Sequence, residues 1–193
     1  MNRLELEKNI EMLINKNEKH LNENEKIEII KNAISNMGDG TGNLNLLIVI
    51  EEFGELIEEI IYFLKTNKIG IGLKEELIDN IIGIKFVEVL LFNNINIDKE
   101  YEKFKKDNNN VLNFNNLILN ASVLQQLISK FLREKTVRDS FQINLFKIKY
   151  DLEKLYEFIK NNDYNNKKLD YLEYLEDLKY LRQKERNLKN IKK

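Results

Sequence analysis

Residues 44–65 read LNLLIVIEEFGELIEEIIYFLK, and residues 74–92 read KEELIDNIIGIKFVEVLLF. In the first segment apolar side chains recur every three or four residues, which predicts a helix with one wide buried face. This stripe comprises Leu46, Val49, Ile50, Phe53, Leu56, Ile57, Ile60 and Leu64. The second segment is apolar on nearly every side, which is typical of a helix buried all round. The two segments therefore predict a helical hairpin at the centre of the fold.

The rest of the chain continues the helical pattern on both sides of this hairpin. Further helices are expected at residues 4–13, 27–37, 98–106, 114–134, 140–160 and 169–188. The chain has no proline, and five of its seven glycines gather in two short segments between periodic stretches. No run alternates apolar and polar residues between hairpin turns, so strands are not expected. The sequence predicts an all-α bundle.

The composition narrows the class of protein further. Across 193 residues, 31 basic and 32 acidic side chains leave a net charge of −1, which predicts neither a nucleic-acid partner nor a membrane partner. The basic tail at residues 179–193 is an exception, and a solvated helix end is favoured there over a nucleic-acid or lipid contact. With no cysteine, no secretory signal and no apolar run of about 20 residues, a cytoplasmic protein is expected.

Two acidic pairs interrupt the apolar segments. Glu52 and Glu55 lie one helical turn apart on the first helix, as do Glu76 and Asp79 on the second. Buried carboxylates are costly unless a positive group neutralises them, and four oxygen ligands on neighbouring helices suit a hard divalent cation such as Mg²⁺. Alternatively, Glu76 and Asp79 cap their helix and stay solvated at its end. The spacing alone leaves both interpretations open.

Together the two pairs resemble the signature of the MazG-like nucleotide pyrophosphohydrolases, members of the all-α NTP pyrophosphatase superfamily. That family carries E-x-x-E on one helix and E-x-x-D on the next. Here the motifs lie within EEFGEL and EELIDNI, with twenty residues between Glu55 and Glu76. The resemblance covers residues 44–106, including a helix after the acidic pairs that begins near Asp98.

The resemblance implies an activity and a set of site residues. Glu52, Glu55, Glu76 and Asp79 would be the catalytic residues and would hold Mg²⁺, with Mn²⁺ as an alternative. The substrate would be a nucleoside triphosphate, cleaved to the monophosphate and pyrophosphate in nucleotide-pool house-cleaning by a homo-oligomer, most simply a dimer. The doubled acids Glu51 and Glu75 project to other helix faces and are not counted as ligands. Glu59 is a candidate for the outer shell of the metal. Lys103 and Lys106 are candidates to bind the phosphates.

The second half of the chain carries no such acidic pairs. A boundary is predicted at residues 107–110, which separates a MazG-like helical domain with N-terminal helices (1–110) from a C-terminal helical region (111–193). Asn45-Leu46-Leu47-Ile48 aligns with Asn116-Leu117-Ile118-Leu119, so residues 111–193 are either a degenerate second copy or helices made similar by biased composition. The alternative to an enzyme is a catalytically inactive helical interaction module that keeps its acids as a relic.

Overall fold

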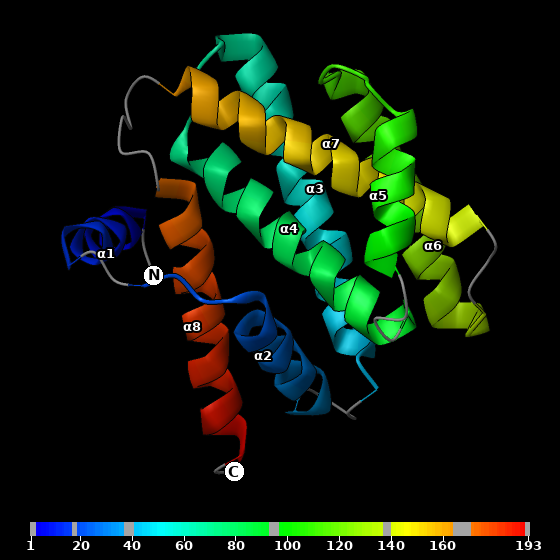
Figure 1. The fold of residues 1–193 in the computed structure, drawn as a ribbon, viewed down its shortest axis with the longest axis horizontal. Coiled ribbons are helices and arrows are strands. Elements are labelled where there is room, and N and C mark those ends of the chain that lie inside the picture. The colour runs from blue at the N-terminus through cyan, green and yellow to red at the C-terminus, as the bar shows by residue number, and fades with distance from the viewer. Residues whose placement is uncertain are drawn as a thin grey trace.

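A computed structural model describes residues 3–16, 19–36, 41–92, 97–136, 140–163 and 171–191. The described residues form eight helices joined by loops, with no strand among them, which confirms the all-α prediction (Figure 1). The helices are α1 (Arg3–Lys16), α2 (Glu23–Asn36), α3 (Asn43–Thr66), α4 (Ile71–Phe92), α5 (Ile97–Asp107), α6 (Phe114–Glu134), α7 (Ser140–Asn162) and α8 (Tyr171–Ile191).

Helices α3 and α4 form the central hairpin. The buried face of α3 follows the predicted stripe except near its end, where Leu64 is 50% exposed and Phe63 is buried instead. The ring of Phe63 packs against those of Phe114 and Phe158, with centroids 5.2 and 5.6 Å away. This aromatic packing makes residue 63, and not residue 64, the buried position at the end of α3.

Helix α4 begins at Ile71, three residues before the predicted start. Its first turn includes Gly72, which the sequence had placed in the loop. A Cβ atom at residue 72 would lie 2.2 Å from Oε1 of Glu59, so the glycine lets the Glu59 side chain on α3 pack directly against this turn. The close approach joins the end of α3 to the start of α4.

A second hairpin, α6 and α7, packs antiparallel on the first. At one end of the α3–α6 pair, the ammonium group of Lys135 donates to Oδ1 of Asn43 over 2.9 Å, and at the other the rings of Phe63 and Phe114 are in contact. The hydrophobic core runs through both hairpins and across the predicted boundary at residues 107–110, which falls between α5 and α6. A degenerate repeat stays a prediction.

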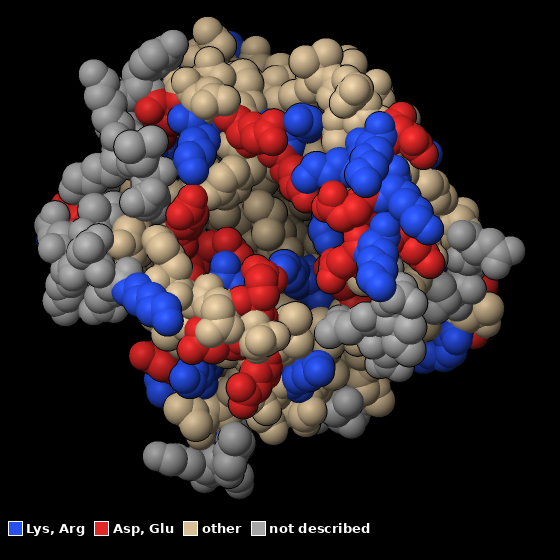
Figure 2. All heavy atoms as spheres, in the orientation of Figure 1, with Lys and Arg blue, Asp and Glu red and all other residues tan. Residues whose placement is uncertain are grey.

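Helices α1, α2 and α8 form a further layer, in which α8 packs against α1, α2 and α4 (Figure 1). A small apolar cluster attaches α2 and α8 to α4; it comprises Ile29, Ile30, Ala33, Phe86 and Tyr180. Acidic and basic side chains are intermingled over the face of the molecule in Figure 2, including around the hollow near its centre. No helix within the described ranges is long and apolar enough to span a membrane.

Candidate metal centre

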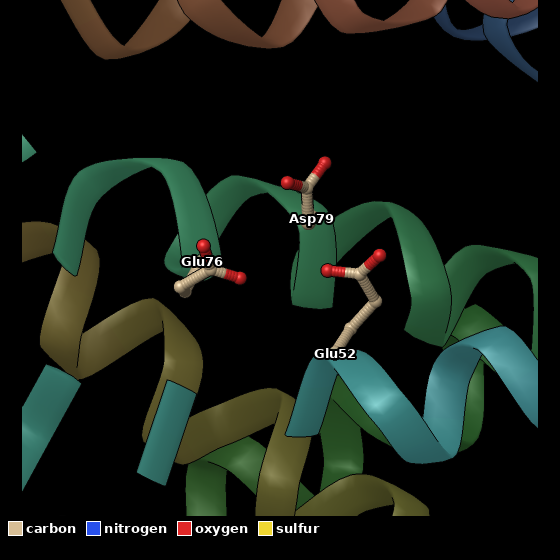
Figure 3. Close-up of side chains that lie close together, drawn as sticks. All are labelled: Glu52, Glu76 and Asp79. Atoms are coloured by element: carbon tan, nitrogen blue, oxygen red, sulfur yellow. The ribbon is translucent and has the colours of Figure 1, made fainter. Parts of the chain in front are cut away.

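Three of the four predicted acids come together where α3 and α4 pack. One carboxylate oxygen each from Glu52 on α3 and from Glu76 and Asp79 on α4 lie within 4.8 Å of one another (Figure 3). All three side chains are half-buried. On α4 the interval of three residues places Glu76 and Asp79 on one face, and Glu52 reaches them from the neighbouring helix. We call Glu52, Glu76 and Asp79 the acidic triad.

The triad is held in place by a residue that the sequence analysis missed. Asn80 is fully buried, and its amide Nδ2 donates to the backbone carbonyls of Glu52 over 2.9 Å and of Glu76 over 2.8 Å. These bonds join α3 to α4 at the level of the triad. The available signal was an asparagine directly after Asp79 in the mostly apolar LIDNII segment, because a buried amide needs hydrogen-bond partners.

Burial and mutual repulsion disfavour the charged form of two of these acids. Burial, followed by the charges of Asp79 and Glu55, raises the pKa of Glu52 to about 7 and that of Glu76 to about 8. Oε2 of Glu76 is also buried without a hydrogen-bond partner among the described residues, and so is Oδ1 of Asn80. Such acceptor atoms are stabilised by a proton or by a cation. The triad thus fits a divalent cation with oxygen ligands.

One cation from the chain itself already reaches the triad. The ammonium group of Lys179 on α8 donates to Oδ2 of Asp79, and this pair is mostly buried. The two residues are 100 positions apart in the chain, so no local pattern could have indicated the contact. Lys179 neutralises one carboxylate of three, which leaves Glu52 and Glu76 without a full counter-charge.

A cavity of about 750 Å³ opens beside the triad, between α3 and α4 on one side and α2 and α8 on the other. Glu52 and Asp79 line it together with apolar side chains that include Val49, Ile82 and Phe86. The opposite wall belongs to the C-terminal half of α8. Basic side chains from that helix line this wall, namely Lys179, Arg182, Arg186 and Lys189. Within the tail that was expected to be a solvated helix end, Arg186 and Lys189 are exposed, and they also line the cavity beside the triad.

The other predicted site residues lie outside this group. Glu55 is exposed on α3 and does not join the triad, although its charge acts on Glu52 and Glu76. Glu59 lies against the first turn of α4 at Gly72.

The two lysines predicted at the phosphates are on α5. Lys103 and Lys106 are exposed there, and α5 packs against α7, where Lys105 pairs with Glu153 over 2.7 Å. Neither predicted lysine lines the cavity beside the triad. The cations that do line it come from α8.

Comparisons with protein-family models, with curated proteins and with solved structures find no match to this chain. The function proposed below therefore rests on the chemistry of the chain's own residues.

Proposed function

We propose that this chain is a divalent-metal-dependent nucleoside triphosphate pyrophosphohydrolase of the MazG-like type. One observation carries the proposal: α3 and α4 bring Glu52, Glu76 and Asp79 within 4.8 Å of one another beside a cavity of about 750 Å³. That volume falls within the range of about 300–1,000 Å³ common for small-molecule sites. The spacing of the acids also matches the two motifs that resemble this family.

The triad would hold Mg²⁺ or Mn²⁺. A metal there supplies a Lewis acid that polarises a phosphoryl oxygen and lowers the pKa of a bound water. The chain's own contribution is to present carboxylates whose raised pKa values and buried oxygen favour a cation over solvent. Asn80 fixes the separation of α3 and α4, and with it the distance between Glu52 and the α4 acids.

Glu55 has a different place in the proposal. It is exposed one turn beyond Glu52 on α3, and its charge still acts on Glu52 and Glu76. Glu55 is exposed and outside the triad, so we assign it an electrostatic effect on the triad and no place among the metal ligands. We also propose that the chain acts in the cytoplasm and as a homodimer.

A panel of common and modified (d)NTPs with Mg²⁺, scored for pyrophosphate and nucleoside monophosphate, tests the activity. Turnover of at least one nucleotide is expected, and Glu52→Gln and Asp79→Asn should each abolish it while the far-ultraviolet circular dichroism is unchanged. Glu58→Gln, which neutralises an exposed acid on α3 outside the triad, is the matched control and should retain turnover. Full activity in both triad variants would overturn the assignment.

A second candidate is a helical interaction module without activity. The observation that favours it is the Lys179–Asp79 pair, because it gives one acid a counter-ion without any metal. This alternative predicts no turnover of any nucleotide and no Mn²⁺ binding by the wild-type chain.

A further inference from the structure

Four basic residues form one face of α8. Lys179, Arg182, Arg186 and Lys189 follow at intervals of three, four and three residues, which places them along one side of a helix, and all four line the cavity. From the first to the last, at about 1.5 Å per residue, the row extends roughly 15 Å. We call these residues the α8 basic row. Lys179 lies at the end next to Asp79, so the row starts at the acidic triad.

Among the described residues, several basic side chains elsewhere in the chain are paired with carboxylates, whereas the outer part of this row is not. Lys26 pairs with Glu176 over 2.9 Å, for example, and Lys149 with Glu88 over 2.6 Å. Arg186 and Lys189 form no ion pair with any residue in the described part of the chain. Cations left without carboxylates along a cavity wall raise the local concentration of anions and offer charge-assisted hydrogen bonds.

The direction of the row is set by packing and needs no ligand. Tyr180 is 1% exposed in the small cluster between α8, α2 and α4. Asn187 is 4% exposed, donates from Nδ2 to the carbonyl of Ile29 over 3.1 Å, and accepts at Oδ1 from Nε2 of Gln183 over 2.9 Å. These contacts hold the C-terminal half of α8 against α2 and keep the basic row turned to the cavity. The helix that carries the row is therefore already in place before an anion binds, which lowers the entropy lost on binding.

We propose that the α8 basic row binds the phosphate groups of the ligand, so that one chain supplies both the metal-binding wall and the phosphate-binding wall. The inference deepens the proposed function and rests on it for the identity of the ligand as a nucleoside triphosphate. The chemistry is general, because a linear polyphosphate carries several charges in a row and can meet several cations at once. Lys103 and Lys106 take no part in this interaction.

The test uses inorganic tripolyphosphate and the full chain in EDTA, with binding measured by isothermal titration calorimetry. Because EDTA removes metal ions, tripolyphosphate cannot bind through a metal at the triad in this measurement. Arg186→Ala should raise the Kd about tenfold or more, since it removes a charged donor. Lys184→Ala is the matched control, because Lys184 is exposed on the same helix, as Arg186 is, but does not line the cavity. It should change the Kd less than about twofold. Binding should weaken as salt is added.

The outcomes separate this inference from the proposed function. Tripolyphosphate binding that depends on Arg186 supports the basic row, whether or not any nucleotide is turned over. Equal effects of Arg186→Ala and Lys184→Ala, or no binding of tripolyphosphate at low salt, would overturn it even if the chain proves to hydrolyse nucleotides.

Discussion

Glu76→Gln is expected to stabilise the metal-free protein, and to do so increasingly as the pH rises. In the folded chain the pKa of Glu76 is raised to about 8 from a usual value of 4.5, first by burial and then by the charges of Asp79 and Glu55. Between these two values the folded state keeps a proton that the unfolded state has lost. The free energy of unfolding therefore falls as the pH rises through this interval. Glutamine carries no charge at any pH and removes this dependence.

The size of the effect follows from the same shift. Each pH unit over which a whole proton separates the two states changes the free energy of unfolding by about 1.4 kcal/mol. The side chain of Glu76 is only half-buried, and solvent screening lowers the total to about 1–2 kcal/mol between pH 5 and pH 8. For a chain of 193 residues, 1 kcal/mol corresponds to roughly 2–4 °C in Tm. The variant should thus gain a few degrees over the wild type at pH 8 and little at pH 5.

Thermal melts in EDTA at pH 5, 6, 7 and 8, followed by circular dichroism, measure this difference. Other groups titrate over the same range, so the quantity of interest is the gap in Tm between the variant and the wild type at each pH. Glu58→Gln removes an exposed acid on α3 and should keep a constant gap. A gap for Glu76→Gln that stays constant from pH 5 to pH 8 would refute the reasoning that the folded chain forces these carboxylates together.

Four further changes test the metal site and the packing and backbone of the helices. Mn²⁺ should raise the Tm more at pH 8 than at pH 6, because protons on Glu52 and Glu76 compete with the metal below their raised pKa values; an equal shift at both pH values would contradict this. Phe53→Ala, at a fully buried position, should cost about 3–5 kcal/mol in urea unfolding. Gly42→Ala should destabilise the chain by about 1–3 kcal/mol, because φ is +77° at this residue. Gly54→Ala lies in the interior of α3, where an added Cβ has room, and should stabilise the chain by about 0.5–1 kcal/mol.

Much of the fold could be predicted because its signals are local. The period of the apolar residues gave α3 and α4 to within three residues at each end, since a helix with one buried face repeats every 3.6 residues. The same periodicity placed Glu76 and Asp79 on one face of α4. Glu52 joined them because it lies on the side of α3 that faces α4, whereas Glu55 points to solvent. Spacing along α3 could not decide between these two acids.

The second wall of the cavity could not be predicted, because it depends on contacts between distant parts of the chain. Nothing in residues 179–193 indicates that Lys179 meets Asp79, or that Arg186 lines a cavity with residues of α3. A basic helix end has the same local pattern whether it faces solvent or an acidic cluster. What turns α8 toward the triad is the packing of Tyr180 and Asn187 against α2.

Crystals of the wild-type chain grown with saturating Mn²⁺ and measured for anomalous scattering test the metal site most directly. The account predicts a peak about 2–2.6 Å from carboxylate oxygens of Glu52, Glu76 and Asp79, with the ammonium group of Lys179 moved away from Asp79. An anomalous map without a peak at the acidic triad, with Lys179 still paired to Asp79, would contradict it.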